Sequence, residues 1–112
     1  MSYFNKFDKK EEIISRTVEV DEEFYNMLEK LSKETYDASI NKLVNAAIEK
    51  LLENENVEIY DQTNSIRISR TFLIRKSLME GLQKMRKKYK IPFYLLVNIA
   101  IRNALIAEEL IE

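Results

Sequence analysis

The tripeptide Ser-Arg-Thr occurs twice in this chain, at Ser15-Arg16-Thr17 and again 54 residues later at Ser69-Arg70-Thr71. Ser and Thr hydroxyls both donate and accept hydrogen bonds, and the Arg guanidinium pairs with planar or tetrahedral anions. These groups suit noncovalent recognition of a polar, anionic surface. The chain has no His and no Cys, so nucleophilic triads and common zinc sites lack their usual components.

Charge is distributed unevenly along the 112 residues. Residues 1–56 hold 8 Lys and Arg against 13 Asp and Glu, a net charge of −5, whereas residues 57–112 hold 10 against 6, a net charge of +4. Residues 65–105 contain ten basic residues and a single acidic residue, Glu80. This concentration predicts a phosphate-binding face, and the alternative is an ordinary solvated helix surface.

No spacing of acids and bases predicts catalysis, and the single Gly cannot form a Gly-rich phosphate loop. We therefore expect no enzyme activity, no cofactor, no metal and no small-molecule substrate. The most apolar stretch, Ile91 to Ile111, is interrupted by polar residues, whereas a membrane span needs about 20 predominantly apolar residues. We interpret it as a buried helix and expect a cytoplasmic protein that does not contact a membrane.

The surroundings of the tripeptide recur as well. At the same offset of 54, apolar positions follow both copies: Val18, Val20, Phe24, Leu28 and Leu31 in the first, and Phe72, Ile74, Leu78, Leu82 and Met85 in the second. Further along, Val44-Asn45-Ala46-Ala47-Ile48 matches Val97-Asn98-Ile99-Ala100-Ile101 at an offset of 53. Three matches in the same order indicate an internal repeat.

Each copy has the pattern of one strand followed by two helices. Alternating apolar positions predict strands over Ile14–Val20 and Ile66–Ile74, the latter with Ile66 on its apolar face. Apolar residues at helical spacing then predict two helices in each copy. Asp21 suits the start of the first helix, Asp37 or Ser39 can cap the second, and Pro92 fits the first turn of the last.

This pattern divides the chain into an N-terminal arm (1–12), a first repeat (13–52), a linker (53–64) and a second repeat with a short C-terminal extension (65–112). A lone strand leaves its hydrogen-bonding groups unpaired and needs a partner. The partner is present on the same chain, so we expect intramolecular antiparallel pairing, with Thr17 and Thr71 near the centre. The predicted fold is mostly α, with a short two-stranded antiparallel β-ribbon.

Two strands over four helices resemble the ribbon-helix-helix DNA-binding family of the Arc and MetJ repressors, over residues 13–52 and 66–106. Tandem versions on one chain resemble transcription regulators of archaeal viruses, which would place the protein in the host cell. The resemblance implies two tandem ribbon-helix-helix repeats that form a single-chain pseudo-dimer. It also implies a double-stranded DNA partner, with the ribbon in the major groove, and a role as a transcription regulator, by default a repressor.

The resemblance also implies which residues touch DNA. Outward side chains of the ribbon would contact bases: Ser15, Thr17, Arg67, Ser69 and Thr71. Among these, Arg67 is the candidate for a bidentate guanine contact. Phosphate contacts would come from the starts of the second helices and from nearby cations: Ser39, Asn41, Tyr94, Arg16, Arg70, Arg75 and Lys76.

Some of these positions leave alternatives open. Glu19 would repel phosphate. It would accept from a cytosine amine or, as we expect in preference, take no part in recognition. Arg16 and Arg70 fall on the core face, so they lean out towards phosphates, are turned by a bulge, or pair with acidic side chains. Arg75 and Lys76 lie near a helix start, where positive charge is unfavourable and a nearby phosphate would explain them.

The alternative function is a helical protein–protein interaction module, such as an antitoxin or an assembly adaptor. The short apolar end at Leu110-Ile111 is a candidate surface for self-association through the C-terminal helix. Salt-sensitive binding to duplex DNA would separate the two functions.

Overall fold

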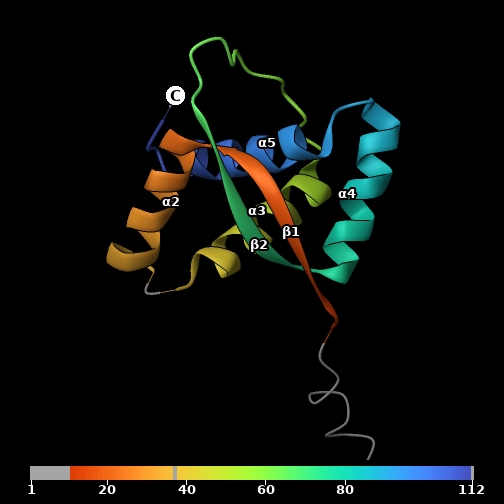
Figure 1. Ribbon diagram of the computed structural model, residues 1–112, viewed down its shortest axis with the longest axis horizontal. Helices are drawn as coiled ribbons and strands as arrows, with labels where there is room; N and C mark the ends of the chain where they lie inside the picture. The colour runs from red at the N-terminus through yellow and green to blue at the C-terminus, as the bar shows by residue number, and fades with distance from the viewer. Residues whose placement is uncertain (1–10, 37, 112) are drawn as a thin grey trace, which may run out of the picture.

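The computed structural model describes residues 11–36 and 38–111 (Figure 1). In this part of the chain two strands and four helices follow one another: β1 (Ile13–Asp21), α2 (Glu22–Glu34), α3 (Ile40–Asn54), β2 (Arg67–Arg75), α4 (Lys76–Tyr89) and α5 (Phe93–Ala107). The fold is mostly helical with one two-stranded antiparallel sheet. Most of the predicted N-terminal arm and the proposed cap Asp37 lie outside the described residues.

The two strands form an uninterrupted antiparallel ribbon in which Thr17 lies opposite Thr71. Their hydroxyl oxygens are 2.8 Å apart and share a hydrogen bond. The predicted pairing within one chain is therefore confirmed. The strand boundaries differ by one residue from those expected, and Ile66 precedes β2 with 66% of its surface exposed. Its predicted place on the apolar face was wrong.

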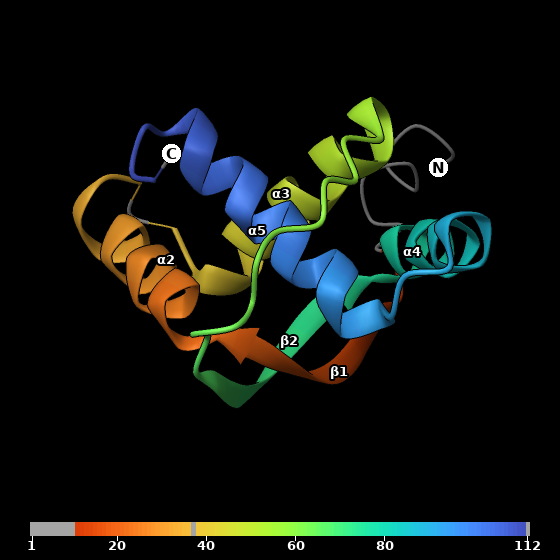
Figure 2. The same cartoon turned by 90° about the horizontal axis from the view of Figure 1, so that it is seen from above.

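All four helices lie on one side of the ribbon (Figure 2). The strands contribute alternate side chains to the core, and the helices contribute their apolar stripes. The predicted core residues are buried: Val18, Val20, Phe24, Leu28, Phe72, Ile74, Leu78, Leu82, Leu95, Leu96 and Ile99. Because the helices cover only this face, the opposite face of the ribbon stays exposed.

The helix starts follow local sequence. The Asp21 carboxylate accepts a hydrogen bond from the Glu23 backbone N–H at 3.0 Å and caps α2. The Ser39 hydroxyl accepts from the Lys42 N–H at 3.2 Å and caps α3. Pro92 is the N-cap residue of α5, one position before the helical turn in which we expected it.

The apolar stretch near the C-terminus forms the buried helix that was predicted, with nine of the 15 residues of α5 buried. Among residues 11–36 and 38–111, no single helix is long and apolar enough to cross a membrane. Only α4 and α5 taken together meet those criteria of length and composition, and they are bent by 106° at the break between them.

The connector between the two β-α-α segments packs against the helices. It begins at Glu55, since α3 runs to Asn54, two residues past the predicted end of the first repeat. The Tyr60 ring lies 5.5 Å from the ring of Phe24, and the Arg102 guanidinium lies 5.3 Å from the Tyr60 ring. Partial burial raises the pKa of the Tyr60 hydroxyl to about 12.

We expect this tyrosine to make the fold sensitive to alkali. Because the Tyr60 pKa is higher in the folded chain than its ordinary value near 10, its contribution to stability is complete below pH 10 and is lost as pH rises towards 12. The free energy of unfolding, measured by urea denaturation, should fall across this range. The Tyr60→Phe variant should show a smaller fall, and an identical fall in both proteins would contradict the prediction.

Candidate nucleic-acid interface

The exposed face of the ribbon brings the predicted base-contacting residues together. Alternation along the two strands points the following exposed side chains away from the helices: Ser15, Thr17 and Glu19 from β1, and Arg67, Ser69, Thr71 and Leu73 from β2. The antiparallel register arranges them in adjacent rows along the ribbon. The result is a narrow, uncovered strip of hydroxyl groups with charged or apolar side chains towards its ends.

Hydrogen bonds between the strands order part of this strip. Thr17 and Thr71 share their bond at the centre, and the Ser69 hydroxyl donates to the Glu19 carboxylate. Each hydroxyl oxygen keeps acceptor capacity, and one of the two Thr hydroxyls keeps a free donor. Glu19 therefore has a partner within the ribbon, and its remaining carboxylate capacity faces outward.

Arg67 is held by two neighbours. Its Nη1 donates to the Gln62 Oε1 at 3.2 Å, and its guanidinium carbon lies 5.0 Å from the centre of the Tyr94 ring. A cation over an aromatic ring is stabilised by about 0.5–1 kcal/mol at exposed sites. These contacts restrict an otherwise flexible side chain at the edge of the strip, and they give Tyr94 a supporting role in addition to its predicted phosphate contact.

Arg16 and Arg70 are exposed although they lie on the core-facing side of their strands. The ladder has no bulge there, and within residues 11–36 and 38–111 neither side chain forms an ion pair. The Arg16 guanidinium lies 4.4 Å from the centre of the Phe93 ring, and that of Arg70 lies 5.0 Å from the Tyr25 ring. Of the alternatives left open, the structure shows no bulge, and among the described residues aromatic faces rather than carboxylates support both guanidiniums.

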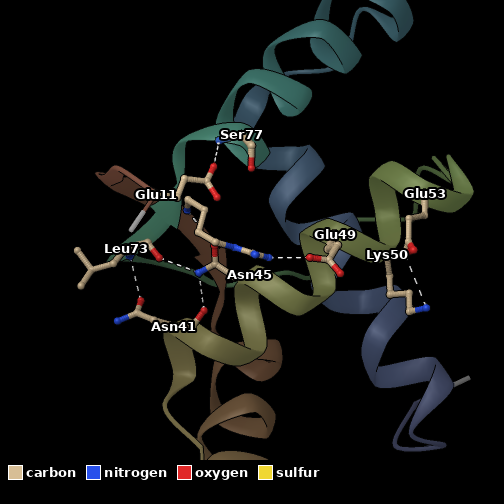
Figure 3. Close-up of polar contacts among 9 residues, drawn as sticks. Glu11, Asn41, Asn45, Glu49, Lys50, Glu53, Leu73 and Ser77 are labelled. Atoms are coloured by element: carbon tan, nitrogen blue, oxygen red, sulfur yellow. Dashed lines mark hydrogen bonds and ion pairs between the residues drawn. The ribbon is translucent and has the colours of Figure 1, made fainter. Parts of the chain in front are cut away.

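Two asparagines satisfy the free outer edges of the strands. Asn98, from α5, accepts from the Asp21 N–H at 2.8 Å and donates to the Glu19 carbonyl at 3.0 Å. Asn45, from α3, accepts from the Arg75 N–H at 2.9 Å and donates to the Leu73 carbonyl at 2.8 Å (Figure 3). Each second helix is thereby fixed against the strand of the other segment.

This anchoring places the start of each second helix beside the ribbon. Asn41, in the first turn of α3, accepts from the Leu73 N–H at 3.0 Å (Figure 3). Its side-chain oxygen is thus bound to the strand, in addition to any phosphate role. Ser39 caps α3, whereas no side chain from the described part of the protein caps α5. The first N–H groups of a helix form an anion site.

Arg75 and Lys76 have carboxylate partners. Arg75 Nη2 lies 2.7 Å from Glu49 Oε2, and Lys76 Nζ lies 3.2 Å from Glu12 Oε2 (the first pair is drawn in Figure 3). A carboxylate therefore offsets the positive charge at this helix start. The phosphate that we invoked to explain these two cations is not required.

The basic cluster of α4 lies away from the ribbon. Lys88 Nζ is 2.8 Å from Glu55 Oε1, at the C-terminal end of α3. The other end of α3 flanks the ribbon, and a helix of 15 residues is roughly 22 Å long. The lysines and arginine of the last turn of α4 therefore fit the solvated helix end that we considered as the alternative.

Sequence reasoning missed the two edge-binding asparagines and the aromatic partners of the arginines. Asn45 and Asn98 carried a usable signal, because a polar residue recurs within two matching apolar runs. A polar side chain in a buried stripe needs hydrogen-bond partners. Tyr25 and Gln62 had no comparable signal, since their partners are 45 and 5 residues away and in different elements.

Comparisons of this chain with protein-family models, with curated proteins and with solved structures found no match. Its function is therefore inferred from the residues and the geometry of the ribbon.

Proposed function

We propose that this protein is a sequence-specific double-stranded DNA-binding transcription regulator that inserts the outer face of its ribbon into the major groove. In this proposal the two β-α-α segments are tandem ribbon-helix-helix repeats forming a single-chain pseudo-dimer. The observation that supports it is the row of exposed hydroxyl groups, with the Arg67 guanidinium, on the face of the ribbon that no helix of the described residues covers. The major groove is wide enough for a two-stranded ribbon, whose outward side chains then reach base edges.

Groups beside the ribbon are suited to the phosphates that line the groove. The N-termini of α3 and α5 flank opposite edges of the ribbon, as the Asn41 and Asn98 contacts show. Arg16 and Arg70 add two guanidiniums supported by aromatic rings. Such contacts fix register and orientation on the duplex but carry no sequence information. Occupation of a promoter would make the protein a repressor.

The salt dependence of duplex binding tests this proposal. Each phosphate that the protein neutralises contributes about −0.9 to the slope of log affinity against log salt concentration. If Arg16 and Arg70 each neutralise one phosphate, the slope should be about −2. If the Arg75 and Lys76 ion pairs open and these two cations also bind phosphates, the slope should steepen to about −4. Fluorescence anisotropy with labelled random duplexes, between about 50 and 200 mM salt, measures this slope.

Variants distinguish the ribbon from the basic end of α4. Arg16→Ala combined with Arg70→Ala should make the slope less steep by about 2, because two phosphate contacts are lost. Arg86→Ala combined with Lys87→Ala, a matched loss of two positive charges in the last turn of α4, should change the slope little. The proposal fails if the unchanged protein has no affinity for any duplex, or if that affinity does not depend on salt.

The second candidate function, a protein–protein interaction module, is favoured by a groove among α2, α3 and α5. The groove has a volume of about 560 Å³ and is lined mainly by apolar side chains from the three helices, including Leu31, Leu43 and Ala104. The predicted self-association surface at Leu110-Ile111 supports this candidate less, because Ile111 packs against the core and, of these two residues, only Leu110 is exposed. Absence of duplex binding would favour this candidate.

A further inference from the structure

The outer face of the ribbon is the same in both strands at its centre and different at its two ends. At the centre, positions 54 residues apart carry the same side chains, Ser15 and Ser69, Thr17 and Thr71. Away from the centre, Ile13 stands where the other strand has Arg67, and Leu73 stands where the other strand has Glu19. Asp21 and Arg75 also occupy corresponding positions on this face and differ, but Asp21 is buried where it caps α2 and Arg75 is bound to Glu49. The difference that a ligand would meet therefore lies mainly in the first two substitutions.

The antiparallel register gathers the two apolar residues at one end of the ribbon. Ile13 lies opposite Arg75, and Leu73 lies in the adjacent row opposite Ser15. Ile13 is 50% exposed and Leu73 is 46% exposed. Arg75 is bound to Glu49, so the groups at this end that are free to contact a ligand are largely aliphatic. In the major groove the apolar group available to them is the C5-methyl of thymine.

The same register gathers Arg67 and Glu19 at the other end. Arg67 lies opposite Asp21, one row beyond the pair of Glu19 and Ser69. Gln62 and Tyr94 hold the Arg67 guanidinium, and the Ser69 hydroxyl holds the Glu19 carboxylate. Arg donates two hydrogen bonds to guanine O6 and N7, and a carboxylate accepts from the cytosine N4 amine. Both side chains thus favour G·C pairs.

We propose that the target of this protein is a non-palindromic duplex site with two chemically different ends. Thymine methyl groups lie under Ile13 and Leu73, and G·C pairs lie under Arg67 and Glu19. The shared hydroxyls contact the central base pairs. This inference rests on the proposed function, and it further implies that one chain docks on the duplex in a single orientation.

Selection from a pool of random duplexes, with protein dilute enough that one chain binds each duplex, is the first test. We expect an asymmetric motif, rich in thymine at one end and in G·C pairs at the other. On the selected duplex, replacing thymine by uracil at the first end removes only methyl groups and should weaken binding about fourfold for each methyl contacted. The same replacement elsewhere in the site should have no effect.

A variant that makes the two strands alike provides the second test. Ile13→Arg combined with Leu73→Glu gives the two strands the same outward residues over 13–19 and 67–73, and leaves only the buried Asp21 and the Glu49-bound Arg75 different. Both substituted positions are exposed, so the fold should persist. This variant should select a palindrome with G·C pairs at both ends. If it does not fold, the uracil test on the unchanged protein still decides the question.

The outcomes separate this inference from the proposed function. A palindromic motif selected by the unchanged protein, or insensitivity to uracil at every position, would overturn the asymmetric site and leave duplex binding intact. An unchanged asymmetric motif for the double variant would overturn the assignment of the ends to these residues. Failure to select any duplex would overturn both proposals.

Discussion

Replacing Asn98 with alanine is expected to lower the free energy of unfolding by about 3–5 kcal/mol. The Asn98 side chain is only 1% exposed, and its amide bonds to the Asp21 N–H and to the carbonyls of Glu19 and Tyr94. A buried backbone group that loses its partner costs about 1–3 kcal/mol, because water cannot replace the bond. Urea denaturation followed by circular dichroism measures the loss.

Asn45 provides a matched control on the other strand. It makes the same three kinds of contact, to the Arg75 N–H and to the carbonyls of Leu73 and Asn41. Asn45 is only half-buried, so water can reach the groups that Asn45→Ala would leave unpaired. We expect a loss of about 1–2 kcal/mol. Equal losses for the two variants would show that burial does not decide the effect.

Arg67→Ala is expected to weaken binding to a preferred duplex far more than binding to a random duplex. Loss of a bidentate guanine contact costs about 1–3 kcal/mol of discrimination, or roughly 5- to 150-fold in relative affinity. Arg67 is already held by Gln62 and Tyr94, so little conformational entropy opposes this contact. Competition between the two duplexes, measured at one fixed salt concentration, reports the ratio directly.

The control for this experiment is Arg75→Ala, which removes the same charge from the same face of β2. Arg75 is bound to Glu49 at 2.7 Å, so its guanidinium is less available for a base. This variant should weaken both duplexes to a similar, smaller extent. An equal loss on preferred and random DNA for Arg67→Ala would remove Arg67 from the base-contacting residues.

The elements of the fold could be predicted because their signals are local. Strand alternation and helical spacing lie within each copy of the repeat, and they gave β1 and β2 to within one residue at each end. Ser39, one of the two caps predicted for α3, was confirmed, since a hydroxyl just before an apolar stripe is a local signal. The course of the connector was harder to predict, because the position of Tyr60 depends on contacts with Phe24 and Arg102, which belong to other elements.

The candidate site was predictable only in part, for the same physical reason. Alternation decided which strand residues face outward, and the exposure of Thr17 and Thr71 follows from it. The environment of Arg16 depends on Phe93, 77 residues away, and no local pattern encodes such a pair.

Each segment supplies the asparagine that binds the strand edge of the other segment. This arrangement has a consequence during synthesis of the chain. The outer edge of β1 is closed by Asn98, which is made 77 residues after Asp21. At about 5–20 residues per second, the edge of the first strand stays open for roughly 4–15 seconds. An unpaired strand edge is a template for pairing with other chains. Two ribosomes translating the same message in close succession would therefore expose matching edges, and chaperone protection should matter most before α5 emerges.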